Sequence, residues 1–221
     1  CDADFAGCPY TLRSTDGVHA DVQGRNTRFP WVGASKGQSL TAQSTPEAEL
    51  ASLNAGMKAR GEPAIQIWKS LLEHWMPSGW ELKINLHEDN TTAIHGVRTG
   101  KNPTMKTLER NFGVKVGYMH EQVCGTGDLG PPSPYALVHT ASRHMSADLY
   151  TKGFTDKTLF GRLKQMINVF SKDQWQSMMF SPEPNAEDAA TIDGPEGRKW
   201  MNMQYHFILR GENTETTDFR K

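Results

Sequence analysis

The chain has 221 residues, a length that allows one domain of ordinary size and an extension. The net charge is -1 and the three cysteines form no CxxC pair, which argues against a chain-wide polyanion-binding field, a structural zinc site and a disulfide framework. Residues 171–221 hold 6 basic and 9 acidic residues, which leaves 18 and 16 in residues 1–170. We therefore expect a folded body over residues 1–170 and a poorly ordered acidic linker and tail over residues 171–221.

The sequence also indicates in which cellular compartment the protein is expected. No run of roughly 18 apolar residues occurs, so we expect no membrane span. No signal peptide precedes Cys1, and reduced thiols suit a cytoplasmic or nuclear protein better than a secreted one. Because the chain begins inside a strand-like stretch, we expect a fragment of a longer product whose first strand is truncated at its N-terminus.

Three short strands are expected near the N-terminus. Residues 1–7 resemble the end of a strand, and residues 17–24 and 28–35 resemble two strands joined through a turn. Proline lacks the N–H that a ladder needs, so Pro30 places the third strand at a sheet edge or at a strand start.

The hydrophobic period then changes to that of helices. Ser44 and the following Thr-Pro-Glu signal a helix start, and a second helix is expected from about residue 64 to residue 75. The later elements are expected to be a strand at 81–87, a short helix from Asp89, a loop at 124–134, a strand at 135–140, and helices at 146–150 and 156–170. Three strands followed by alternating units predict an α/β fold, a mixed sheet with helices on its faces.

Four acids lie where the ends of these elements are expected to meet. They are Asp2 in the first strand, Glu49 in the first long helix, Asp89 after the strand at 81–87, and Asp148 after the last strand. Mg²⁺ prefers carboxylate and water oxygens, and two ions about 4 Å apart can activate water and stabilise the leaving oxygen of a phosphodiester. The pattern therefore makes these four acids candidate ligands for a divalent cation at a nuclease site.

The segments that carry these acids resemble the ribonuclease H region of copia-type LTR retrotransposon reverse transcriptases. They are residues 1–14 (CDADFAGCPYTLRS), 44–50 (STPEAEL), 88–94 (EDNTTAI) and 147–153 (ADLYTKG). The segment KNPTMKTLERNF between the third and the fourth is also similar to the family. The motifs occur in the family's order and at similar spacing, and the resemblance covers residues 1–170.

The resemblance implies a ribonuclease H-like fold, in which helices flank a mixed five-stranded sheet. It implies an endoribonuclease that uses two Mg²⁺ ions, for which Mn²⁺ could substitute, and that cleaves the RNA strand of RNA–DNA hybrids during reverse transcription. Asp2, Glu49, Asp89 and Asp148 match the family's catalytic metal ligands. A reverse transcriptase domain is then expected upstream in the Pol polyprotein, a virus-like particle is a possible setting, and no small-molecule cofactor is expected.

Alternatives remain at each acid. Asp4 faces the same side of the strand as Asp2, although the family match favours Asp2. Glu47 lies on a different helix face from Glu49 and suits a helix N-terminus. Asp89 could cap the helix behind it, and Asp148 could be a surface acid.

Further residues are candidates for handling the substrate. His139 lies nine residues before Asp148, where cellular ribonucleases H carry a flexible histidine that helps release product, and His144 competes for this role. Other residues could contact the sugar–phosphate backbone or form a phosphate-tracking strip, although a plain solvated face explains the basic ones equally well. This set contains Ser14, Asn90, Arg98, Lys101, Lys106 and Arg110.

The sequence departs from the family in one segment. Asn111, Gly113 and Gly117 stand where the family usually shows a histidine and an aspartate. Two other functions stay open: an inactive or co-opted remnant that retains a nucleic-acid-binding fold, and an integrase-like nuclease. The four-acid pattern fits ribonuclease H better than a three-acid integrase.

Overall fold

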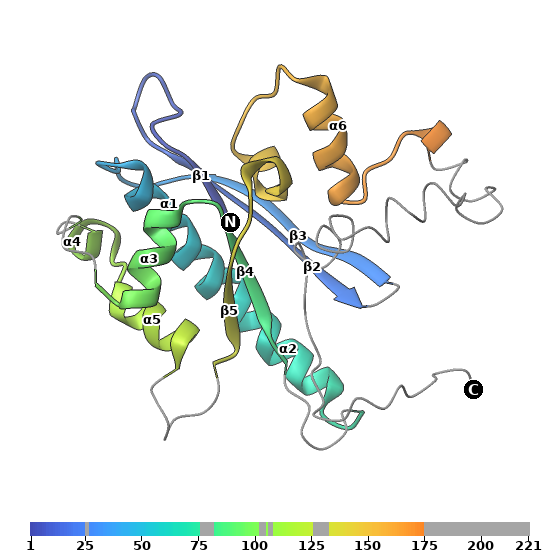
Figure 1. The fold of residues 1–221 in the computed structure, drawn as a ribbon, viewed down its shortest axis with the longest axis horizontal. Helices are drawn as coiled ribbons and strands as arrows, with labels where there is room; N and C mark the ends of the chain where they lie inside the picture. The colour runs from blue at the N-terminus through green and yellow to red at the C-terminus, as the bar shows by residue number, and fades with distance from the viewer. Residues whose placement is uncertain (25–26, 76–81, 102–104, 106–107, 126–132, 175–221) are drawn as a thin grey trace.

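The computed structural model describes residues 1–24, 27–75, 82–101, 105, 108–125 and 133–174 (Figure 1). This described part is a mixed α/β structure with a three-stranded antiparallel sheet, a two-stranded parallel sheet and six α-helices. None of its helices has the length and apolar character of a transmembrane segment. Most of the expected loop at 124–134 and of the expected tail at 171–221 lies outside the described residues.

The antiparallel sheet contains the three strands expected near the N-terminus. They are β1 (Asp2–Asp4), β2 (Thr15–Gly24) and β3 (Thr27–Gly37), in the order β1-β2-β3. Pro30 lies on the edge strand β3, opposite Asp21, where the register shifts. The predicted edge position of this proline is therefore confirmed, since a bulge on an outer strand tolerates the missing N–H.

The parallel sheet pairs β4 (Ile84–Glu88) with β5 (Tyr135–His139). In the described residues the five strands therefore form two sheets, and the single five-stranded sheet that we expected is not formed. Cys1 nitrogen donates a hydrogen bond of 3.1 Å to His87 oxygen, which directly links the start of β1 to β4. A single hydrogen bond does not make a ladder between β1 and β4, and β1, with three residues, offers little backbone for further pairing.

The two long helices follow β3 as expected. Helix α1 (Thr45–Gly56) leads through a π-helical turn (Met57–Gly61) into α2 (Glu62–Leu72). Ser44 is the N-cap of α1, as the sequence predicts. Helix α1 contacts both β1 and β2, so its first turns lie beside the N-terminal strand.

The remaining helices surround the parallel sheet and the edge of the antiparallel one. They are α3 (Thr91–Thr99), α4 (Leu108–Phe112), α5 (Val116–Cys124), the 3₁₀ turns Ser142–His144 and Ser146–Tyr150, and α6 (Lys157–Met166). Figure 1 shows α3 and α5 beside β5, and α6 on the other side of the molecule near β3. The helix expected at 146–150 is a 3₁₀ turn, and the one expected at 156–170 ends at Met166.

One apolar core joins these elements beneath the ends of β1 and β4. Leu50 and Leu53 of α1 are fully buried against side chains of β4, β5, α3 and α5. Leu86 and Val97 belong to the same cluster. Burying a side chain of this size contributes roughly 1.5–3 kcal/mol, so the cluster holds α1 at a fixed place relative to β4.

Candidate metal centre

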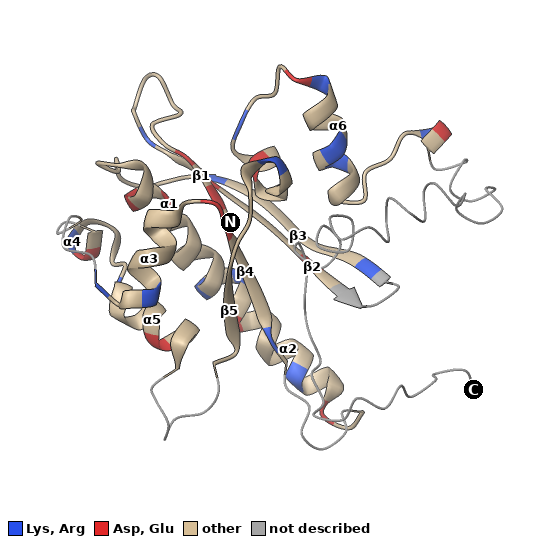
Figure 2. Cartoon of the chain, viewed as in Figure 1, with Lys and Arg blue, Asp and Glu red and all other residues tan. Residues whose placement is uncertain are grey.

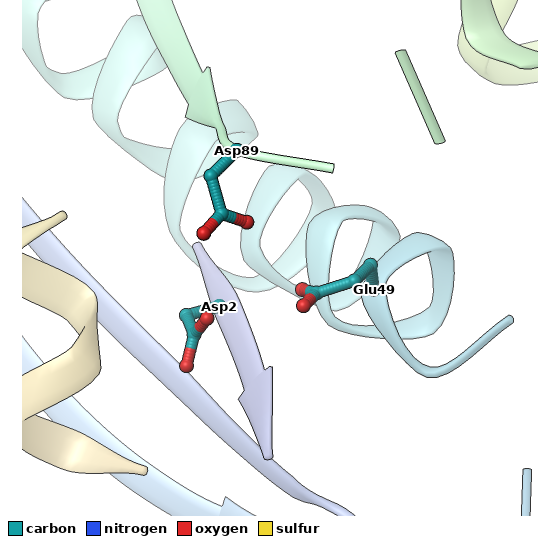
Figure 3. Close-up of side chains that lie close together, drawn as sticks. All are labelled: Asp2, Glu49 and Asp89. Atoms are coloured by element: carbon teal, nitrogen blue, oxygen red, sulfur yellow. The ribbon is translucent and has the colours of Figure 1, made fainter. Parts of the chain in front are cut away.

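Three of the four expected metal ligands converge. Asp2 comes from β1, Glu49 from α1, and Asp89 directly follows β4. Each offers a carboxylate oxygen, and these oxygens lie within 4.8 Å of one another. Figure 3 shows the three carboxylates turned toward one another from three different elements. Asp2 and Glu49 are 1% and 4% exposed, so two of the three charges are shielded from water.

The start of α1 determines which glutamate faces this cluster. Ser44 Oγ accepts a hydrogen bond from Glu47 nitrogen at 3.4 Å, and the Glu47 carboxylate accepts one from Gln43 nitrogen at 2.7 Å. Glu47 is thus used in capping the helix, as its position in the first turn suggested. Glu49 lies two residues further on, on a different face of α1, and points toward β1 and Asp89.

The Asp89 carboxylate can face the cluster because Asn90, and not Asp89, is the N-cap of α3. The Asn90 side chain accepts hydrogen bonds from Thr92 nitrogen at 3.0 Å and from Ala93 nitrogen at 3.1 Å. The alternative in which Asp89 caps this helix is therefore wrong. Ser142 Oγ instead donates a hydrogen bond of 2.6 Å to Asp89 Oδ2 and fixes that carboxylate from the turn after β5.

Asp2, not Asp4, is the strand acid that reaches the cluster. The backbone oxygen of Asp2 accepts a hydrogen bond of 2.8 Å from Ser52 Oγ, which ties β1 to α1. The Asp4 carboxylate lies against Gly7 in the following turn. The two side chains therefore have different surroundings, although they are two residues apart on one strand.

Asp148 lies beside Asp2 but outside the group of three. It is 5% exposed and lies in the 3₁₀ turn Ser146–Tyr150. Lys152 Nζ lies 3.0 Å from Asp148 Oδ1 and 3.1 Å from Asp2 Oδ1. The Thr151 hydroxyl donates a hydrogen bond to Asp2 Oδ2. The fourth acid thus reaches Asp2 through a lysine, and it is not the solvated surface acid of the alternative interpretation.

The electrostatics of the cluster favour a bound cation. Burial, followed by the negative charges of Glu88, Asp2 and Asp89, raises the pKa of Glu49 to about 10. Burial and then the charge of Asp2 raise the pKa of Asp148 to about 7, against the opposing effect of Lys152. Glu49 Oε2 is buried and has no hydrogen-bond partner among the residues that the structure describes. A set of carboxylate oxygens suits Mg²⁺ or Mn²⁺. A bound cation would offset the repulsion between the carboxylates and would coordinate an oxygen that lacks a hydrogen bond.

Glu88 is a further buried acid that the sequence did not single out. It is 0% exposed, and its Oε1 accepts a hydrogen bond of 3.0 Å from Asn90 nitrogen. Burial raises its pKa to about 7. The alternation along β4 indicates this placement, because Leu86 and Glu88 are both buried while His87 between them is only partly buried.

The two candidate histidines occupy different places. His139 is exposed at the end of β5 and pairs in register with Glu88, so it lies at the same end of the sheet as Asp89. His144 lines a cavity of about 100 Å³ between β2 and β4. Cys1 and His87 also line this cavity, whereas Glu49, Asp89 and Asp148 do not.

The residues expected to contact nucleic acid are spread over the surface and the interior. Ser14 is 1% exposed and accepts a hydrogen bond of 3.2 Å from Ala6 nitrogen, so it holds the turn after β1 rather than facing solvent. Arg98, Lys101 and Arg110 are exposed, and Asn90 is partly exposed at its cap position. Lys106 lies outside the described residues.

No family model matches the chain, and no curated protein or solved structure matches it either. A function for this site therefore has to be argued from its residues and their geometry.

Proposed function

We propose that the chain is a metal-dependent phosphodiester hydrolase whose cation binds Asp2, Glu49 and Asp89. The observation that carries the proposal is the convergence of three carboxylates from three elements, one of which, Glu49, has a buried Oε2 without a hydrogen-bond partner among the described residues. Lys152 offsets the charge of Asp2, but holding the nearly buried Glu49 beside Asp2 and Asp89 is costly because like charges repel. A structural role alone does not explain why α1, β1 and β4 each direct an acid to one point.

Within this class we propose a ribonuclease H of the copia-type retrotransposon kind, acting on RNA–DNA hybrids. The acids that converge are those in the motifs DAD, EAE and DN that resemble this family. The hydrogen bond from Cys1 to His87 brings the start of β1 beside β4, although the described strands form two separate sheets. Reverse transcription in a cytoplasmic virus-like particle or in the nucleus, beside an upstream reverse transcriptase domain, belongs to the same proposal.

The residues around the site have separable roles. A divalent cation bound there would lower the pKa of a bound water and would neutralise charge on the scissile phosphate. Asp2, Glu49 and Asp89 hold that cation through carboxylate oxygens. Ser142 keeps Asp89 oriented, and Ser52 keeps the backbone of Asp2 against α1. In other metal sites, mutation of a residue that hydrogen-bonds to a ligand typically lowers metal affinity by about 10–100-fold.

The charge distribution is compatible with a polyanionic substrate. Figure 2 shows acidic colour along β1 and basic colour on α2, α3 and α6. Exposed Arg98, Lys101 and Arg110 lie on or near α3 and α4, the helices that follow Asp89 along the chain. We propose that these cations contact phosphates of the hybrid, while the acids contact only the phosphate that is cleaved.

The direct test is Mg²⁺-dependent cleavage of an RNA–DNA hybrid labelled on the RNA strand. We expect cleavage by the wild-type chain, a loss of at least roughly 100-fold in Asp89→Asn because a metal ligand is removed, and little change in the matched control Asp4→Asn. Equal cleavage by wild type and Asp89→Asn would contradict the assigned site. A folded wild-type chain that binds the hybrid without cleaving it would instead favour the inactive or co-opted remnant.

A further inference from the structure

A lysine ammonium lies between two nearly buried carboxylates next to the candidate metal centre. Lys152 Nζ is 3.1 Å from Asp2 Oδ1 and 3.0 Å from Asp148 Oδ1. The side chains of Asp2 and Asp148 are 0% and 7% exposed, while that of Lys152 is 36% exposed. The positive charge therefore approaches the acid pair from the solvent side.

The surroundings hold this arrangement in place. Lys152 follows Asp148 by four residues, and Thr151 between them donates a hydrogen bond to Asp2 Oδ2. A Cβ on Gly17 of β2 would lie 2.5 Å from Thr151 Cγ2, so the turn that carries these residues packs closely on β2. Although burial lowers the pKa of Lys152, the carboxylates of Asp2 and Asp148 raise it above its usual value. The two short contacts and the packing of the turn therefore fix the position of the Lys152 side chain.

We propose that Lys152 occupies a second cation position, formed by Asp2 and Asp148. In this arrangement the chain binds one divalent ion at Asp2, Glu49 and Asp89 instead of the two Mg²⁺ ions that the resemblance implies, and the ammonium supplies the second positive charge. A divalent ion can enter between Asp2 and Asp148 only when Lys152 is displaced. This inference rests on the proposed metal site, but it concerns how many ions that site takes.

The geometry favours this role over that of an ordinary salt bridge. A surface ion pair joins one cation with one anion, whereas Lys152 contacts two acids from different elements at nearly equal distances. Asp2 belongs both to this pair and to the group of three carboxylates, so the two cation positions share one ligand. Two cations that share a carboxylate stabilise a clustered acidic site more than one cation does.

Counting bound Mn²⁺ ions tests the inference. We would titrate Mn²⁺ into the full chain by calorimetry and count the sites again by electron paramagnetic resonance of free Mn²⁺. The wild type is expected to bind one ion, as are Lys152→Arg, which keeps the charge, and Lys157→Met, a control on an exposed lysine of α6. Lys152→Met is expected to bind two ions, because the Asp2–Asp148 pair becomes accessible.

Two results would overturn the inference: two ions of similar affinity on the wild type, or a single ion on a folded Lys152→Met variant. Lys152→Gln serves as the second variant if the methionine variant does not fold, and the wild-type count is decisive by itself. Hybrid cleavage on the same samples separates this inference from the proposed function. If the wild type binds two ions and cleaves the hybrid, the proposed function holds but the role of Lys152 is wrong. If the wild type binds one ion and does not cleave the hybrid, the role of Lys152 holds but the proposed function is wrong.

Discussion

Ser142 Oγ donates a hydrogen bond of 2.6 Å to Asp89 Oδ2 and so links the turn after β5 to the residue after β4. This bond fixes one oxygen of the carboxylate that follows β4. The parallel sheet therefore supplies both the acid and the group that positions it.

Removing this hydroxyl should weaken metal binding without unfolding the chain. We expect Ser142→Ala to lower Mn²⁺ affinity by roughly tenfold, because an outer hydrogen bond to a metal ligand is lost. Calorimetric titration measures the change, and Ser70→Ala on an exposed face of α2 is the matched control. Identical affinities for wild type and Ser142→Ala would show that the bond does not position Asp89.

The stability of the metal-free protein should fall as the pH rises. The pKa of Glu49 is raised from 4.5 to about 10, so the folded chain keeps a proton over this range that the unfolded chain releases. The free energy of unfolding is therefore highest below about pH 4.5 with respect to this group, and decreases toward pH 10. Asp148 adds to the decrease between pH 3.8 and about 7.

Urea denaturation in a chelator at pH 5 and pH 8.5 measures this dependence. Glu49→Gln should reduce the decrease, and excess Mg²⁺ should reduce it in the wild type, since the ion takes the place of the proton. A metal-free wild type that becomes more stable from pH 5 to pH 8.5 would contradict the assigned environment of Glu49.

Close packing at Gly17 should be needed for the position of the Lys152 turn. A Cβ at Gly17 would lie 2.7 Å from Ala147 oxygen, whereas a Cβ at Gly37 meets nothing within 4 Å. We expect Gly17→Ala to destabilise the chain by about 1–3 kcal/mol, the usual effect of overpacking, and Gly37→Ala to have a much smaller effect. Thermal unfolding compares the two, and equal melting temperatures would argue against tight packing of this turn on β2.

The cap of α3 should contribute to stability separately from metal binding. Asn90→Ala removes the acceptor for Thr92 and Ala93 nitrogens and should cost about 1 kcal/mol, whereas Asn90→Asp keeps the acceptor. Urea unfolding measures the difference. If Asn90→Ala is as stable as the wild type, another residue must serve as the cap.

The local elements were predictable where the sequence carries a strong local signal. Ser44, Pro46 and Glu47 fixed the start of α1, and Pro30 indicated an edge strand, because caps and proline act within a few residues. The expected helix at 156–170 ends early, at Met166, and Asn168 has a positive φ of 60°. Asparagine is one of the few residues that adopt this conformation readily, so Asn168 is a local signal for the end of the helix.

The candidate site was predictable in its acids but not in their partners. The placement of Asp2, Glu49 and Asp89 followed from motifs at the ends of elements. The role of Lys152 depends on Asp2, which lies 150 residues away in the sequence, so local spacing could show only its pairing with Asp148. Similarly, the hydrogen bond between Ser142 and Asp89 joins residues 53 positions apart, so local spacing could not show it.

The central claim is that Asp2, Glu49 and Asp89 share one divalent cation. The most direct measurement is the Mn²⁺ dissociation constant of wild type, Glu49→Gln and the control Asp4→Asn, with circular dichroism to confirm that each is folded. We expect Glu49→Gln to bind Mn²⁺ at least roughly tenfold more weakly than the wild type, and Asp4→Asn to bind it as the wild type does. Equal binding by wild type and Glu49→Gln, or no binding by the folded wild type, would contradict the claim.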